Sequence, residues 1–123
     1  MAVDERTTTE AAIVSTVLDY FEGWFDGDAA RMERALHPGL AKRSLAHDGP
    51  TLNETTAASM IDETRRGVGR ERDPGDRRIE VEVEDVYRTI ANATVHSAVY
   101  REYVQLVRTH EGWRIVNTLW TWA

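Results

Sequence analysis

The chain contains no cysteine. This absence excludes disulfide bonds, thiolate metal ligands and cysteine nucleophiles, and it fits a reducing compartment, so we expect a cytoplasmic location. Long apolar runs are also missing, since none approaches the roughly 18 residues that a membrane-spanning helix needs. The first ten residues are polar and carry no apolar segment of the kind found in signal peptides. We therefore expect no membrane partner.

An excess of positive charge is absent too. Lys and Arg number 15 against 21 Asp and Glu, which gives a formal net charge of −6. Binding to a phosphate backbone requires clustered cations, so this balance argues against nucleic acid as a partner. Metal-ligand spacing is also missing, because His47, His96 and His110 pair neither with one another nor with two carboxylates at suitable spacing. We expect neither a metal nor another cofactor.

What the sequence does contain is a helical first half. The length of 123 residues suits a single domain, 1–123, in which residues 1–7 are expected to be flexible. The segment Thr7–Glu10 has the form of a capping box that opens a first helix. Two adjacent apolar stripes at helical spacing predict that this helix covers a sheet. They are Val14, Leu18, Phe21 and Phe25, and Ile13, Val17, Tyr20 and Trp24.

Two shorter helices are predicted to follow. Gly27 should end the first helix, and Asp28 should cap a second helix that extends to Leu36. The residues His37-Pro38-Gly39 are then expected to break the chain. A third helix is predicted from about residue 55 to residue 66, and the Gly- and charge-rich segment 67–76 is expected to be a mobile loop.

The second half of the chain predicts strands. In the β-branched run from residue 79 to residue 87, Ile79, Val81 and Val83 alternate with Glu80, Glu82 and Glu84, a period of two that is typical of a half-buried strand. Helices followed by such strands indicate an α+β fold, in which three helices pack on one face of a strongly curved antiparallel sheet and form a cone. The other predictions are a strand at 40–47, a short return strand at 51–52, a turn at Ala91-Asn92, one long bent strand at 93–109, a turn at 110–112 and a final strand at 113–122.

Three segments resemble a known family. They are Tyr20–Asp28, which ends the first helix, Leu36–Arg43, and Trp113–Trp120, which opens the last strand. Together with the order of elements, they are similar to the NTF2-like superfamily and, more narrowly, to its "putative lumazine-binding" group. The resemblance covers nearly the whole chain and implies a cone with an internal pocket. Because the superfamily includes ketosteroid isomerases, SnoaL-like polyketide cyclases, dehydratases and binding proteins, the fold alone does not choose among these functions.

The isomerase chemistry of that superfamily needs three groups, which can be compared with this sequence. Tyr20 stands where the isomerases have a phenol. Ser44 stands where their general base should be, and residues 103–106 hold no carboxylate where a second acid belongs. A phenol without a base cannot abstract a proton next to a carbonyl by that mechanism. We therefore expect no steroid-type isomerase activity and assign no catalytic residue.

A pocket between the first helix and the sheet is the predicted binding site. Tyr20 and Trp24 share a helix face that would line it, although the same spacing also suits ordinary core packing. Arg43 is predicted to point inward with Leu45, where its guanidinium would donate to a carboxylate or carbonyl. His37 equally suits a capping role, and a bulge would change the facing of the later strands. The predicted ligand-binding residues are Tyr20, Trp24, His37, Arg43, Tyr103, Gln105 and Asn117.

Three functions remain open at this point. The leading hypothesis is a protein that binds a flat, partly apolar small molecule. The alternatives are a cofactor-independent cyclase, isomerase or dehydratase that uses Tyr20 with His37 or Arg43, and a structural or interaction module with a vestigial pocket. The final strand is apolar on both faces, so Val116 and Trp120 are predicted to lie on an outer face that forms a homodimer.

Overall fold

The computed structural model describes residues 2–123, with side chains from Glu5 onward. None of the helices within this range is both long enough and apolar enough to cross a membrane. In chain order the elements are α1 (Ala2–Asp26), α2 (Ala29–Ala35), β1 (Leu36–Leu45), β2 (Leu52–Thr55), α3 (Ala57–Arg65), the 3-10 helix η1 (Arg70–Arg72), β3 (Glu80–Tyr87), β4 (Ile90–His96), β5 (Tyr100–Thr109) and β6 (Gly112–Trp122).

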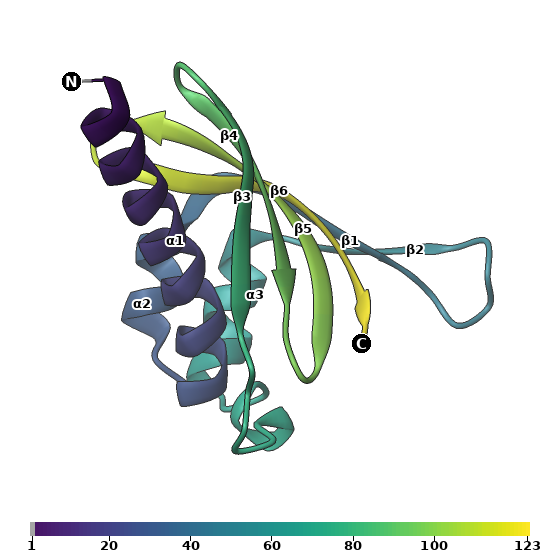
Figure 1. Ribbon diagram of the computed structural model, residues 1–123. Helices are drawn as coiled ribbons and strands as arrows, with labels where there is room; N and C mark the ends of the chain where they lie inside the picture. Colours follow the sequence, from purple (N-terminus) through teal and green to yellow (C-terminus); the bar gives the residue numbers. More distant parts are fainter. Residues whose placement is uncertain (1) are drawn as a thin grey trace.

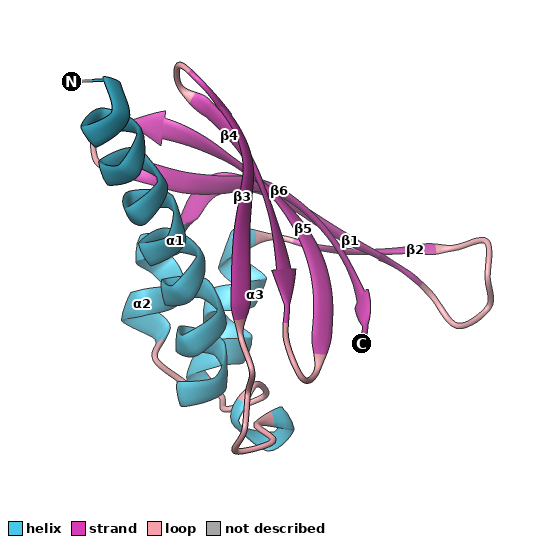
Figure 2. Ribbon diagram, in the orientation of Figure 1, coloured by secondary structure: helices cyan, strands magenta, loops and turns pink. Residues whose placement is uncertain are grey.

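The helices lie together on one face of a curved sheet (Figure 1, Figure 2). Its six strands follow the order β2-β1-β6-β5-β4-β3. The predicted α+β class, with three helices on a curved sheet, is therefore confirmed. The sheet is not wholly antiparallel, however, because β1 and β6 pair in parallel while the other neighbours are antiparallel. Parallel pairing is possible here because a long stretch of chain, including α3 and four strands, connects β1 to β6.

Helix α1 begins earlier than the sequence predicted. It starts at Ala2, so the Thr7–Glu10 capping box does not mark its first turn. An ion pair between Arg6 and Glu10, one helical turn apart at 3.5 Å, supports this N-terminal extension. Further along, Ile13, Val17, Tyr20, Phe21 and Phe25 of the predicted apolar stripes are buried, and the other three stripe residues are half-buried. Because α1 contacts both β3 and β6, it covers much of the inner face of the sheet.

A tight turn joins α1 to α2 and fixes the end of the long helix. Gly27 has a φ of +69°, a conformation that glycine adopts without steric cost. Asp28 then accepts a hydrogen bond from the backbone N of Arg31, which confirms its predicted capping role. The Arg31 guanidinium also pairs with Asp19 of α1 at 2.9 Å. The turn of α1 that carries Trp24 is thereby held in place.

Strand β1 begins directly after α2, at Leu36, rather than at residue 40. The segment His37-Pro38-Gly39 therefore does not break the chain but lies inside the strand. Pairing with β6 jumps there from Leu36 to Ala41, which is the mark of a bulge. The bulge accommodates Pro38, which has no backbone N–H to donate to the sheet.

Two strand boundaries lie at positions without glycine or proline. β3 and β4 are joined at residues 88–89, with Arg88 at positive φ, whereas the predicted turn at Ala91-Asn92 is part of β4. The predicted single strand at 93–109 is in fact two strands, separated at residues 97–99. There the Ser97 hydroxyl accepts a hydrogen bond from the backbone N of Tyr100 at 2.9 Å. A serine that bonds the backbone in this way forms a turn without glycine.

Strand β6 contains a bulge at Val116. Its neighbours Ile115 and Asn117 pair with consecutive residues of β5, so Val116 is left without a partner. The bulge changes which side chains of β6 face the helices. Before it the odd-numbered residues do, as at Ile115, and after it the even-numbered residues do, as at Trp120. The prediction that Trp120 lies on the outer face is therefore wrong, and the exposed outer residue is Leu119.

Candidate functional site

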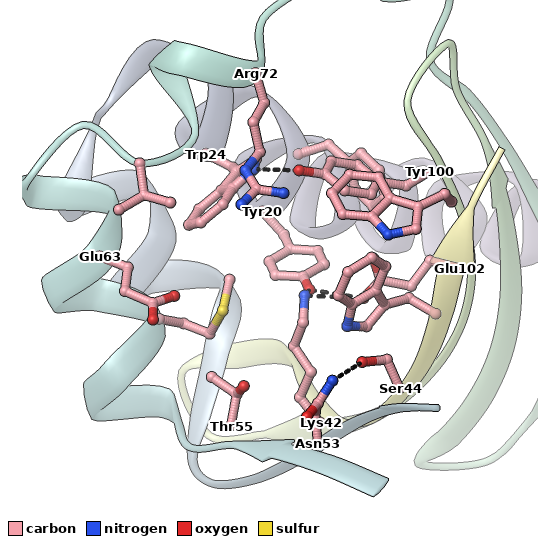
Figure 3. A pocket seen from close by; sticks show the side chains of 15 residues that line it. Tyr20, Trp24, Lys42, Ser44, Asn53, Thr55, Glu63, Arg72, Tyr100 and Glu102 are labelled. Atoms are coloured by element: carbon pink, nitrogen blue, oxygen red, sulfur yellow. Dashed lines mark hydrogen bonds and ion pairs between the residues drawn. The ribbon is translucent and has the colours of Figure 1, made fainter. Parts of the chain in front are cut away.

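A cavity of about 290 Å³ lies between the helices and the inner face of the sheet (Figure 3). Its lining comes from α1, α3, β1, β5 and β6, with residues near η1 and β2 at the rim. This volume is near the lower end of the roughly 300–1,000 Å³ that small-molecule sites usually have. Much of the wall is aromatic, with contributions from Tyr20, Phe21, Trp24, Tyr100, Trp120 and Trp122.

Three polar side chains meet in this cavity, each from a different element. Tyr20 of α1 donates from Oη to Oε2 of Glu102 of β5 at 2.6 Å. Lys42 of β1 donates to the same phenol oxygen, and its Nζ lies 3.5 Å from Glu102 Oε2. The Lys42 ammonium also lies over the rings of Tyr20 and Trp120, 4.9 and 5.5 Å from their centroids. These three residues form the Lys42–Tyr20–Glu102 cluster.

The cluster is almost shut off from solvent. The side chains of Lys42 and Glu102 are 11% and 3% exposed. Burial, together with the charge of Glu102, raises the pKa of Tyr20 well above its usual value, so the phenol remains a hydrogen-bond donor. Burial also lowers the pKa of Lys42, although the charge of Glu102 opposes this. The Lys42 ammonium therefore releases its proton more readily than an exposed lysine does.

An aromatic wall stands next to the cluster. Tyr100 stacks on Trp122, with centroids 5.3 Å apart, and meets Trp120 edge-on at 5.4 Å. Trp24 of α1 donates from Nε1 to Tyr100 Oη at 3.0 Å. These contacts fix large apolar ring surfaces at the edge of the cavity, where a flat ligand could stack on them.

Two charged side chains lie at the rim. Glu63 of α3 lines the cavity, and the Arg72 guanidinium lies 5.0 Å from the centroid of the Trp122 ring. Arg72 is brought there by the segment 67–76, which the sequence predicted to be a mobile loop. The segment contains η1 and packs on the end of α1 so closely that a Cβ at Gly69 would lie 2.1 Å from the Trp24 carbonyl oxygen. Its contacts thus help to shape the rim.

Of the seven predicted ligand-binding residues, Tyr20 and Trp24 line the cavity. Arg43 does not, because it points away from the helices and pairs with exposed Glu54 at 3.0 Å. The prediction relied on Leu45 as an inward-facing neighbour, but Leu45 is 63% exposed near the β1–β2 turn. The inward residue of the pair is Lys42.

The other predicted residues also lie elsewhere. Tyr103 is 53% exposed on the outer face of the sheet. Gln105 and Asn117 are on the same face, joined by a side-chain hydrogen bond of 3.0 Å. His37 accepts a hydrogen bond from the backbone N of Gly39 and is not part of the cavity wall. The predicted convergence of these side chains on Tyr20 is therefore wrong, because the boundary at Ser97 and the bulge at Val116 set the opposite facing.

The two charged members of the cluster were missed by the sequence prediction. Glu102 lies one residue before the 103–106 stretch in which a carboxylate was sought. A usable signal existed, because Tyr100, Val104 and Leu106 alternate with polar residues and share the parity of Glu102. Ser44, at the position of the isomerase base, does line the cavity, where it offers a hydroxyl rather than a carboxylate.

Within the part of the chain that the structure describes, no group of three or more His, Cys, Asp or Glu side chains is placed to hold a metal ion.

Comparison with known proteins supports the fold and a family. The sequence model of the family described as "Putative lumazine-binding" matches residues 8–121. No curated protein matches the sequence significantly.

Several solved structures have the same fold. An NTF2-like protein of unknown function from Silicibacter pomeroyi is 16% identical with a TM-score of 0.72, and the match covers 100% of both chains. One from Shewanella baltica is 13% identical with a TM-score of 0.69 and 95% coverage of each chain. A cystatin-like domain of unknown function from Nostoc punctiforme is 16% identical, with a TM-score of 0.65, and the match covers 94% of this chain and 77% of that one. At these identities the similarity establishes an NTF2-like, cystatin-like fold and does not define an activity.

The burial of the cluster predicts strong energetic coupling between Lys42 and Glu102. Lys42→Met or Glu102→Leu alone should each lower the free energy of unfolding by about 3 kcal/mol, because one charge is left buried without its partner. The double variant should lose much less than the sum, with a coupling of about 1–3 kcal/mol in urea unfolding at pH 7. The exposed pair Arg43–Glu54 provides the control cycle, Arg43→Met with Glu54→Leu, for which coupling below about 1 kcal/mol is expected. Additive losses at Lys42 and Glu102 would contradict the burial of this pair.

Proposed function

We propose, since this chain belongs to the family described as "Putative lumazine-binding", that it binds a small, flat, partly apolar molecule in the cavity beside the Lys42–Tyr20–Glu102 cluster. The volume of about 290 Å³ suits one or two fused rings. A cytoplasmic location, expected from the absence of cysteine, is part of this proposal.

The cluster is the observation that carries the proposal. Burying an ion pair costs desolvation free energy, and a protein with well-packed apolar residues in place of the pair is often equally stable or more stable. Ligand recognition therefore explains the position of Lys42 and Glu102 beside an aromatic cavity better than stability does. Lys42 would donate to a carbonyl or anionic oxygen of the ligand, while Trp120 and Trp122 would offer ring surfaces for stacking. Lumazine, a fused two-ring dione, has both features and is a suitable first probe.

The buried carboxylate supports a second candidate, a cofactor-independent acid–base enzyme. Glu102 and Tyr20 are a buried acceptor and a buried donor in one cavity, which is what proton transfer next to a carbonyl requires. His37 and Arg43, the partners first suggested for Tyr20, lie outside the cavity, so Glu102 takes that role. Deuterium uptake at the carbon beside the carbonyl of a bound ketone, lost in Glu102→Gln, would favour this candidate over simple binding.

The binding proposal predicts different effects for two adjacent residues of β1. Lys42→Met should weaken lumazine binding by roughly ten- to a hundredfold in isothermal titration calorimetry, because a charge-assisted hydrogen bond of about 1.5–3 kcal/mol is lost. Arg43→Met is the matched control, since Arg43 occupies the next position and faces outward. It should leave the dissociation constant unchanged.

Equal weakening by the two substitutions would show that the probe binds elsewhere. If lumazine, and then a wider set of flat heterocycles, produced no heat and no bound species in native mass spectrometry, the binding proposal would fail.

We also propose a homodimer through the outer face of the sheet. Tyr103, Leu119 and Ile90 are 53%, 52% and 55% exposed there, which is unusual for apolar residues grouped on one face. Between them, Asn92, Gln105 and Asn117 form a row of side-chain hydrogen bonds that leaves further amide groups available to a partner.

Because Leu119, and not Trp120, lies on this outer face, Leu119 is the residue whose substitution tests the dimer. Leu119→Glu should convert a dimer to a monomer at micromolar concentration in sedimentation velocity, because a charge would be buried in the interface. Ser15→Glu adds the same charge to the exposed side of α1 and should leave the dimer intact. A wild-type chain that sediments as a monomer would rule out this interface.

A further inference from the structure

Lys42 is the only lysine of the chain, since all the other residues counted among its 15 Lys and Arg are arginines. The two side chains differ chemically, because a guanidinium keeps its proton in proteins, whereas an amine can lose it and act as a nucleophile. The surface of this protein thus carries its positive charge on arginine. The single nucleophilic side-chain amine is placed in the cavity.

The surroundings of that amine suit nucleophilic chemistry. Nζ contacts Tyr20 Oη and lies 3.5 Å from Glu102 Oε2, so a proton donor and a proton acceptor are both within reach. Nζ also lies 5.5 Å from the centroid of the Trp120 ring. Glu63, the other acidic residue of the wall, lies on α3 across the cavity (Figure 3). Burial favours the neutral amine, which is the form that attacks a carbonyl carbon.

We propose that Lys42 forms a reversible imine with an aldehyde or ketone group of the molecule bound in the cavity. This inference rests on the proposed binding function and adds the class of ligand, a carbonyl compound whose reactive carbon reaches the cluster. It also gives the isolated lysine a role that an arginine at position 42 would not fulfil.

The step is balanced by the residues present. Glu102 takes one proton from the Lys42 ammonium, and the neutral Nζ attacks the carbonyl carbon. One of the two protons on the attacking nitrogen then passes to the carbonyl oxygen, which becomes a hydroxyl and leaves a neutral carbinolamine. The nitrogen electron pair then expels this hydroxyl as water, with the proton held by Glu102. The products are a protonated imine and one water molecule, formed from the ammonium and the carbonyl compound without any oxidant or reductant. Tyr20 stays protonated throughout; its hydroxyl donates to Glu102 in the free protein and turns to the oxygen that carries developing charge once Glu102 holds a proton.

Borohydride trapping with 2-naphthaldehyde tests the proposal. Reduction converts an imine to a stable secondary amine, so one naphthylmethyl group should be found on the peptide that contains Lys42. In Arg43→Lys, a second amine is introduced at the adjacent, outward-facing position. Lys42 should be labelled at least about tenfold faster than the introduced amine, because a ligand held beside a nucleophile reacts as if at high concentration. Lys42→Arg, which keeps the positive charge, should show no label at position 42.

The outcomes separate this inference from the binding proposal. Equal labelling of the two amines, or label confined to the amino terminus, overturns imine formation. If 2-naphthalenemethanol, which has no carbonyl, binds the wild-type protein while 2-naphthaldehyde leaves Lys42 unlabelled, the imine is excluded and the binding site stands. If neither compound binds or labels the protein, both proposals fail. Preferential labelling that the alcohol suppresses by competition supports both.

Discussion

The contact between Lys42, Tyr20 and Glu102 is the interaction on which the site depends. It joins α1, β1 and β5, so it forms only after the helix has packed on the sheet. Each partner compensates for the burial of the others: the carboxylate accepts from the phenol and neutralises the ammonium, which also lies near the Trp120 ring. Such a cluster contributes little net stability compared with an apolar core. Its value lies in a fixed, water-poor set of donors and acceptors next to an open volume.

Backbone irregularities decide which side chains share that volume. The bulge at Val116 turns Trp120 inward. In β1 the alternation is unbroken across the bulge, since Leu36, Leu40, Lys42 and Ser44 share one parity and face the helices, and this parity leaves Arg43 outside. Without the bulge, the second half of β6 would present the opposite set, because a shift by one residue exchanges the two faces of a strand. The outer position of Asn117 and Leu119 is a consequence of the same bulge.

These features explain how far the sequence could predict the structure. Helical periodicity placed Tyr20 and Trp24 correctly, since α1 is regular and the 3.6-residue repeat leaves little ambiguity about its buried face. In β6 the predicted facing failed because a period of two is reversed by a single bulge, and Val116 gives no sequence signal of one. In β1 it failed because Leu45, on whose inward facing the prediction relied, is exposed. The turns at Arg88 and Ser97 were missed because neither contains glycine, and the hydroxyl of Ser97 supplies the bond that shapes its turn. Glu102 was within reach of prediction, as it shares parity with buried neighbours.

Because Lys42 is the only lysine, its protonation can be measured without interference. Protein grown with lysine labelled with ¹³C at Cε and ¹⁵N at Nζ should give one side-chain resonance, and its pH titration reports the pKa of Lys42 in the folded protein. The structure predicts a pKa below the ordinary lysine value of about 10.4, because burial outweighs the attraction of Glu102. Stability from this residue should then rise with pH between the folded and unfolded pKa values, since the unfolded chain binds the proton more tightly. A resonance that titrates at or above the ordinary value would contradict the central claim that Lys42 is held as a desolvated amine in the cavity.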